Sequence, residues 1–222
     1  RFMTQLAYGT VRNTLLCDHA LRRICTQPLE KLPPPILAIL RMGVFQSLFC
    51  DQVNHPSMVN TSVDLAKKRG HAGTARLVNA VLRRAPQTLD AVKLPDKTND
   101  LAAFLSIRHS MPRWLVDRWL VEYGATIAES LCIASSETAP VSLRVNTTRI
   151  APEDLLEKLR ASGLAVEKRT GVPEELTAAD TAKLLRTQWF REGCFTFQDP
   201  ASMLVAHLLE PTPGMRVLDL CA

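Results

Sequence analysis

The sequence lacks a run of about 18 apolar residues, the length that a membrane-spanning helix needs. Its opening residues also lack the charged segment leading into an apolar stretch that marks a secretion signal. There is no internal repeat and no low-complexity segment. These absences argue against a membrane protein and a repeat protein. We therefore expect a soluble, cytoplasmic protein with no membrane partner.

Cysteine is present, but not in the patterns that bind zinc or form a disulfide framework. There is no Cys-x-x-Cys pair and no cluster of cysteine and histidine at zinc-ligand spacing. Most cysteines lie next to apolar residues, which indicates reduced, buried thiols. We expect no bound metal, and we expect His55, His71 and His109 to be surface or helix-capping residues. The six cysteines are Cys17, Cys25, Cys50, Cys132, Cys194 and Cys221.

The net charge of +5 is distributed unevenly along the chain. Residues 1 to 95 hold 13 Lys and Arg against 5 Asp and Glu, a net +8. Residues 96 to 222 hold 14 against 17, a net −3. This asymmetry favours a front domain that meets a polyanion. The alternative is a basic surface that is merely solvated.

Apolar residues at helical spacing cover the first 135 or so positions, which predicts an all-helical domain. Tyr8, Val11 and Leu15 share one helical face. A helix with Leu40 and Leu48 follows the stop at Pro33–Pro35. Further helices are expected at about Pro56 to Arg69 (with Val59, Val63 and Ala66 inward), Gly73 to Arg84, Leu101 to Ile107, Pro112 to Tyr123 and Thr126 to Ala134.

Several of these helices end in basic residues. Lys67, Lys68 and Arg69 precede the helix stop at Gly70, and an arginine pair precedes Pro86. Arginine grips phosphate bidentately and lysine acts as a mobile point charge, so such ends are candidates for RNA contacts. The alternative is a set of solvated side chains that cap helix carbonyls. The predicted RNA-binding residues are Arg12, Arg22, Arg23, Lys67, Lys68, Arg69, Arg83 and Arg84.

Two tryptophans flanked by arginines, in the run Arg113 to Trp119, resemble a stacking platform for nucleic-acid bases. We favour a core role for this group, because Leu115 and Trp119 lie four residues apart on a helix that needs an apolar face.

After a polar linker at residues 135 to 140 the pattern changes to that of a small α+β unit. Val141 to Asn146 alternates apolar and polar residues, as a half-buried strand does. A helix is expected from Pro152 to Gly163, with further strands at Leu164 to Glu167 and Cys194 to Phe197. Their order suits a split β-α-β module, although residues 170 to 192 allow no assignment. A last helix opens at Pro200, and Met215 to Leu220 is predicted to begin a new α/β sheet.

At this point the sequence resembles a known family, the bacterial small-subunit (16S) ribosomal RNA cytosine-5 methyltransferases of the Sun/Fmu (RsmB-like) type. Gly214 to Ala222 resembles the family's first cofactor strand and loop, and Phe197 to Ser202 resembles its Gln-Asp-x-x-Ser segment. Leu143 to Asn146 resembles the strand that opens its middle domain, and Val78 to Arg84 resembles the RNA-binding helical domain shared with the antitermination factor NusB. One departure is Asn60 to Val63, where the family commonly has Asn-Glu-Ala-Val.

The resemblance implies a multidomain protein. Residues 1–135 would form an all-α NusB-like domain that binds RNA, and residues 136–197 a small α+β (RRM-like) domain. Residues 198–222 would supply the first helix and strand of an α/β Rossmann-like methyltransferase domain that binds S-adenosylmethionine. Cys221 and Ala222 would lie at the edge of the cofactor site. Asp199 would lie near it or serve as a helix N-cap.

The same resemblance implies that the catalytic residues are absent. Carbon-5 of cytosine becomes nucleophilic only after a cysteine thiolate attacks carbon-6, and carbon-5 then takes the methyl group. In the family this cysteine follows threonine and a second cysteine follows proline, whereas no cysteine here follows either residue. We expect a chain truncated at both ends, which binds ribosomal RNA as a monomer and methylates nothing.

Two alternatives remain. A non-enzymatic NusB-like adaptor for RNA or protein explains residues 1–135 equally well, but gives no purpose to Gln198 to Ala222. A nucleotide-dependent oxidoreductase needs a Gly-x-Gly-x-x-Gly loop, from which Leu220 to Ala222 departs.

Overall fold

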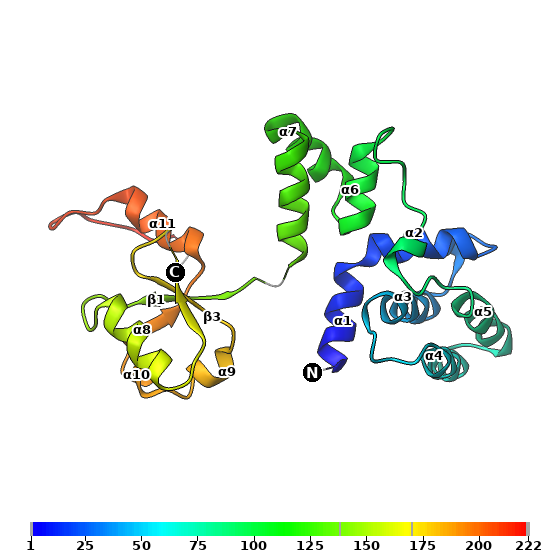
Figure 1. Ribbon diagram of the computed structural model, residues 1–222, viewed down its shortest axis with the longest axis horizontal. Helices are drawn as coiled ribbons and strands as arrows, with labels where there is room; N and C mark the ends of the chain where they lie inside the picture. Colours follow the sequence, from blue (N-terminus) through cyan, green and yellow to red (C-terminus); the bar gives the residue numbers. More distant parts are fainter. Residues whose placement is uncertain (1, 138, 170, 221–222) are drawn as a thin grey trace. The chain divides into compact units, whose positions relative to one another are not determined.

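The computed structural model describes residues 2–137, 139–169 and 171–220. The chain forms two compact units, Arg1–Glu137 and Thr138–Ala222, here called unit 1 and unit 2 (Figure 1). Each unit has its own core. Within the described ranges, none of the helices combines the length and the hydropathy that a bilayer crossing requires.

Unit 1 is helical, as the sequence predicts. Two short 3-10 helices, η1 (Leu29–Lys31) and η2 (Leu89–Ala91), lie between its longer helices. The α-helices are α1 (Phe2–Arg12), α2 (Thr14–Ile24), α3 (Pro34–Phe49), α4 (His55–Arg69), α5 (Ala72–Leu82), α6 (Leu101–His109) and α7 (Arg113–Ser136).

The main core of unit 1 surrounds α3, which packs against α1, α2, α4 and α5. Ile36, Leu40 and Val44 recur every fourth residue along α3 and are fully buried. Burial of one such side chain stabilises the folded state by about 1.5–3 kcal/mol. This row of residues therefore makes a large contribution to the packing of the helices around α3. From α4, Val59 and Ala66 enter the same core, which confirms the inward face predicted for that helix.

Local capping explains the tight connection between α4 and α5. Gly70 follows α4 directly after its three basic residues, as the sequence predicts. His71 then caps α5: its Nδ1 accepts the N–H of Gly73 at 3.1 Å, and its own N–H donates to Thr74 Oγ1 at 3.0 Å. These bonds satisfy groups at a helix end that lack intrahelical partners. The expected capping role of His71 is confirmed.

A smaller core joins α6 to α7 and contains Leu105, Val116 and Cys132. α7 is two helices joined at Gly124, whose φ of 76° lies in the left-handed region that glycine adopts without strain. The two halves correspond to the two helices that the sequence predicts on either side of this residue.

The aromatic group of α7 divides between core and surface. Trp119 packs partly against the smaller core, whereas Trp114 is 67% exposed. The core interpretation is therefore confirmed for Trp119 and wrong for Trp114. Arg113 and Arg118, which flank these rings, pair with Asp100, Asp117 and Glu122. Because acidic groups neutralise both arginines, a nucleic-acid platform has little support at this place.

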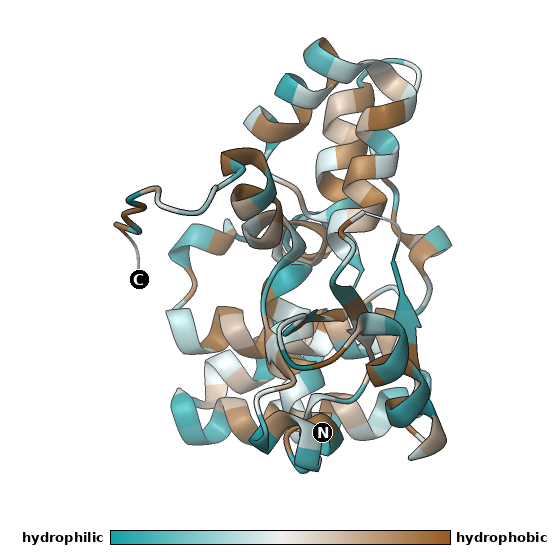
Figure 2. Ribbon diagram, turned by 90° about the vertical axis from the view of Figure 1, so that its left-hand side faces the viewer, coloured by the Kyte–Doolittle hydropathy of each residue, from teal (hydrophilic) through white to brown (hydrophobic). Residues whose placement is uncertain are grey.

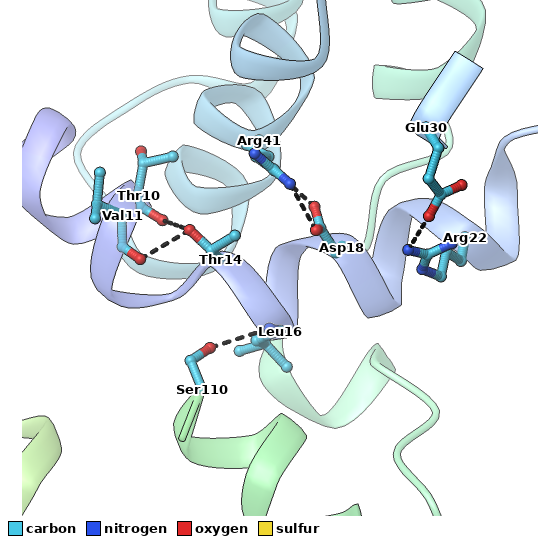
Figure 3. A network of polar contacts seen from close by, with 9 residues as sticks. All are labelled: Thr10, Val11, Thr14, Leu16, Asp18, Arg22, Glu30, Arg41 and Ser110. Atoms are coloured by element: carbon cyan, nitrogen blue, oxygen red, sulfur yellow. Dashed lines mark hydrogen bonds and ion pairs between the residues drawn. The ribbon is translucent and has the colours of Figure 1, made fainter. Parts of the chain in front are cut away.

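Ser110 ties the smaller core to the main core (Figure 3). It follows α6 with a left-handed φ of 52°, and its Oγ accepts the N–H of Leu16 in the first turn of α2 at 3.0 Å. Asn13, at the N-cap position of α2, makes no capping bond with its side chain. Ser110 therefore replaces the local cap from a distant part of the chain.

Ser110→Ala is expected to lower the free energy of unfolding of unit 1 by about 1 kcal/mol, within the range of about 0.5–2 kcal/mol for a lost cap. Urea denaturation followed by circular dichroism measures it. Ser130→Ala is the matched control, because the Ser130 hydroxyl is exposed and donates only to Thr126 of its own helix. Equal stability of the Ser110 and Ser130 variants would show that the remote cap contributes nothing.

The apolar face predicted for the first helix lies at the surface. Tyr8 is 72% and Val11 74% exposed, and the helix is interrupted at Asn13, so that Leu15 belongs to α2. α1 packs its opposite side against α3, where a Cβ on Gly9 would fall 2.1 Å from Cζ of Phe45. The spacing correctly predicted a helix. The face of α1 that contains Gly9 packs against α3, because glycine allows a closer approach than the larger residues of the apolar face.

Unit 2 holds a four-stranded antiparallel sheet of order β2-β3-β1-β4. Its strands are β1 (Val141–Val145), β2 (Val166–Lys168), β3 (Glu175–Ala178) and β4 (Phe195–Phe197). Leu143 and Val145 of β1 pack with Leu155 and Leu159 in one core, while Arg144 between them is exposed. The helices are α8 (Pro152–Ala161), α9 (Thr181–Leu184), α10 (Gln188–Arg191) and α11 (Pro200–Leu209). The predicted small α+β domain is confirmed.

The segment that the sequence left unassigned, residues 170 to 192, contains β3, α9 and α10. β3 pairs with both β1 and β2, and all four of its residues are buried. β3 has only four residues, Glu175 to Ala178, so its polar–apolar alternation is at the lower limit of the length that indicates a strand. The burial of Glu175 and Thr177 depends on tertiary packing, which periodicity does not show.

The strand predicted at Met215 to Leu220 is absent from the described structure. The segment is irregular, and Leu218 is 80% exposed. A strand requires a neighbour for its backbone hydrogen bonds, and none of the described strands pairs with this segment. α11 also exposes apolar side chains, among them Leu204, Val205 and Leu208. Its ribbon is coloured largely as hydrophobic in Figure 2.

Candidate nucleic-acid interface

The eight cationic side chains predicted to contact RNA are all exposed, and all lie at C-terminal ends of helices in unit 1. A helix carries partial negative charge at this end, so cations there also stabilise the helix itself. Arg12 ends α1, Arg22 and Arg23 lie in the last turn of α2, Lys67, Lys68 and Arg69 in that of α4, and Arg83 and Arg84 directly follow α5.

The ends of α2 and α5 border the same core, because Ile24 and Cys25 pack against it and Leu82 and Ala85 lie in it. Burial raises the pKa of the Cys25 thiol, and the positive charge of Arg84 opposes that rise. Cys25 is the C-cap of α2, next to Arg22 and Arg23. Arg84 is near enough to Cys25 for its charge to act on the thiol, so we group Arg22, Arg23, Arg83 and Arg84 as one cluster of four arginines.

The remaining predicted contacts do not join this cluster directly. Lys67, Lys68 and Arg69 precede α5, whereas Arg83 and Arg84 follow it, and this helix of 11 residues spans about 16 Å. Arg12 is separated from Arg23 by the length of α2, also 11 residues. A ligand that touches all of these groups must therefore be extended.

Sequence reasoning missed Arg76, which fills the gap along α5. Its side chain is exposed and makes no hydrogen bond or ion pair with the described residues. It precedes Arg83 by seven residues, or about two helical turns, so both lie on the same side of the helix. That spacing was the signal available in the sequence. We call the set formed by Arg76, the four clustered arginines and Lys67, Lys68 and Arg69 the α5 basic edge.

Carboxylates neutralise only part of this charge. Arg22 pairs with Glu30 and lowers the pKa of its carboxyl group, and Lys67 Nζ lies 3.0 Å from Asp64 Oδ1. Both pairs are exposed, and such pairs contribute about 0–1 kcal/mol, so an incoming phosphate can replace the carboxylate. Arg83 donates from Nε to Asn79 Oδ1 at 3.0 Å. Arg12, Arg23, Lys68, Arg69 and Arg84 have no such partner among the described residues.

Most of the thiols that the structure describes are buried, and burial disfavours the thiolate form. Cys17, Cys50, Cys132 and Cys194 are buried, which confirms the expectation for these four, and Cys25 is half-buried. Burial raises the pKa of the Cys17 thiol to about 12, so it stays protonated at neutral pH. No group of three His, Cys, Asp or Glu within the described ranges is arranged to hold a metal ion.

The predicted cofactor contacts, Cys221 and Ala222, lie outside the described residues. Asp199 accepts the N–H of Ala201 at 2.8 Å and is the N-cap of α11, which favours the capping alternative for that residue. Four grooves of about 410 to 690 Å³ indent unit 2, and none is lined by residues 201 to 220.

Comparison with protein-family models gives two matches. Residues 1–87 match the NusB family, and residues 111–182 match the ferredoxin-like domain described as Methyltr_RsmF/B-like. The two matches fall in the order that the sequence predicts, a helical domain followed by a small α+β domain.

Curated relatives extend the similarity to the whole chain. A probable ribosomal RNA small subunit methyltransferase B of Bacillus subtilis is 33% identical over 99% of this chain and 48% of its own length. A probable protein of the same name from Synechocystis is 30% identical over 100% of this chain and 50% of its own. The chain thus spans about half the length of the curated relatives it matches.

A solved structure, "Crystal Structure of PH0851", has the same fold over 96% of this chain and 47% of its own length. The TM-score is 0.65 at 22% sequence identity.

Proposed function

Since this chain combines NusB-type and RsmF/B-type domains and is homologous throughout its length to small-subunit ribosomal RNA methyltransferases B, we propose that it is the RNA-binding part of such an enzyme. The complete protein would transfer a methyl group from S-adenosylmethionine to carbon-5 of a cytosine in small-subunit ribosomal RNA. It would act as a monomer in the cytoplasm. The adaptor alternative has less support, because the similarity to methyltransferases includes the last residues of the chain.

The α5 basic edge is the observation that carries this proposal. It presents eight cations along one helix and its neighbours, and most of them have no carboxylate partner among the described residues. RNA is an extended polyanion, and side chains that contact its phosphates fix the register of the protein on the strand. Arg12 would extend the contact by the length of α2.

S-adenosylmethionine, when bound, supplies a methyl group on a positively charged sulfur. Of the residues predicted to lie near it, Cys221 and Ala222 are outside the described residues and Asp199 is the N-cap of α11, so no cofactor contact is assigned to the described residues. We place the completed cofactor site and the attacking cysteine in the half of the relatives' length that lies beyond the match, with Cys221 and Ala222 at its edge. The role of this chain is to bind and orient RNA.

A methyl-transfer assay with labelled S-adenosylmethionine and small-subunit ribosomal RNA tests the division of roles. The chain alone is expected to retain the RNA on a filter at low salt and to incorporate no label. Turnover above background would contradict the absence of catalytic residues. Failure to retain RNA would contradict the binding role.

A further inference from the structure

Unit 2 carries a cationic groove that the proposed function does not use. It is an open groove of about 410 Å³ between α8 and the α9–α10 segment. Its lining includes Leu164, Lys183, Arg186, Gln188 and Trp189. We call it the Trp189 groove.

The charge of the Trp189 groove distinguishes it from three larger grooves of the same unit. Each of those includes a carboxylate: Glu167, Glu174 or Asp199. The Trp189 groove includes none. It is therefore a locally positive place in a part of the chain, residues 139 to 220, that holds 10 Lys and Arg against 11 Asp and Glu.

The two cations of the groove are available to a ligand. Lys183 Nζ lies 3.4 Å from Asp180 Oδ2, a long contact between exposed side chains of neighbouring turns. The guanidinium of Arg186 makes no hydrogen bond or ion pair with the described residues. An exposed pair such as Lys183–Asp180 contributes about 0–1 kcal/mol, so a phosphate can replace the carboxylate.

Trp189 is anchored to the rest of unit 2 by packing and by backbone hydrogen bonds. It packs against the core of unit 2, and its carbonyl accepts the N–H of Cys194 at 2.8 Å. The hydroxyl of Thr187 caps the same turn by accepting the N–H of Phe190 at 3.3 Å. These bonds fix the backbone of Trp189, and its half-buried side chain packs against the core and lines the groove together with Lys183 and Arg186.

We propose that the Trp189 groove binds an unpaired nucleotide of the RNA, with the base against Trp189 and the flanking phosphates on Lys183 and Arg186. This inference rests on the proposed function. Bases of an A-form duplex are stacked inside the helix and cannot reach an aromatic ring, whereas those of a single strand can. The groove's volume is near the lower end of the range for small-ligand sites, about 300–1,000 Å³, which suits one nucleotide.

The fluorescence of Trp189 reports on this site alone. In a W114F/W119F background, Trp189 is the one remaining tryptophan of the three. Titration with an oligouridine is expected to quench its emission in a saturable way. A duplex RNA of equal length and uridine monophosphate are expected to leave it unchanged. Equal quenching by the duplex would overturn the assignment to an unpaired nucleotide. Equal quenching by the mononucleotide would overturn the role of the flanking phosphates.

Charge reversal provides the second arm of the test. K183E/R186E is expected to abolish the quenching and to make the log–log salt slope of oligouridine affinity shallower by about 1.4, or about 0.7 for each contact to a single strand. K158E/R169E is the matched control, with the same charge change on exposed residues of unit 2 outside the groove. It is expected to keep the quenching.

Anisotropy of a labelled RNA separates this inference from the proposed function. RNA that binds with no change in Trp189 emission overturns the groove and leaves the α5 basic edge intact. RNA that does not bind at all overturns the proposed function, and the groove with it.

Discussion

Replacement of Lys67, Lys68 and Arg69 by glutamate is expected to weaken the binding of small-subunit ribosomal RNA at least about tenfold at physiological salt. The log–log salt slope should become shallower by about 2.1–2.7, because each neutralised phosphate contributes about 0.7–0.9 to it. These residues form the end of the α5 basic edge that lies before α5, and two of the three have no partner among the described residues. Fluorescence anisotropy over a range of salt concentrations measures both quantities.

A charge-preserving variant, K67R/K68R/R69K, is the control and is expected to keep both the affinity and the slope. Glutamate at a helix C-terminus also opposes the helix dipole, at about 0.3–1 kcal/mol for each residue. Circular dichroism must therefore show that the triple variant is folded. A folded triple-glutamate variant with unchanged affinity and slope would remove the RNA interface from α4.

Leu40→Ala is expected to lower the free energy of unfolding of unit 1 by about 2–5 kcal/mol, the range for a large-to-small change in a close-packed core. Leu40 is fully buried in α3, which four other helices contact. Leu65→Ala is the matched control: Leu65 lies on α4 of the same unit but is exposed, so its replacement should cost less than about 1 kcal/mol.

Urea denaturation in a Trp189→Phe background follows unit 1 alone, because the remaining tryptophans, Trp114 and Trp119, both lie in it. If the core is centred on α3, Leu40→Ala should lower the free energy of unfolding clearly more than Leu65→Ala. Equal loss of stability in both would mean that α3 is not the centre of unit 1.

Much of the helical unit could be predicted from local signals. The stop at Gly70, the cap at His71 and the break near Gly124 depend on residues close in sequence, and the structure has each where the pattern indicated. The first strand of unit 2 was predictable for the same reason, since Val141 to Val145 alternates between core and surface.

The failures all depend on distant contacts. β3 was missed because its polar–apolar alternation covers only four residues, and its pairing with β1 and β2 joins distant parts of the chain. The exposed face of α1 was misleading because Gly9 allows a closer approach to Phe45 on the other side. Met215 to Leu220 has strand-like composition, but composition does not supply the neighbouring strand that pairing requires.

The candidate interface shows the same division. Composition and helix ends identified eight exposed cations, but their roles in RNA binding stay predictions. Which of them lie near one another could not be read from the sequence, because the proximity of Arg84 to Cys25 depends on the tertiary fold. Arg76 lies inside α5 rather than at its end, so basic helix ends alone do not identify it.

Lysine footprinting tests the central claim most directly. Amine-selective labelling of the chain, with and without small-subunit ribosomal RNA, is read by mass spectrometry at each lysine. Lys67 and Lys68 are expected to become protected when RNA is bound, while Lys158, exposed on α8 of unit 2, keeps its reactivity. If RNA binds and both lysines of α4 react as fast as in its absence, the α5 basic edge is not the RNA interface.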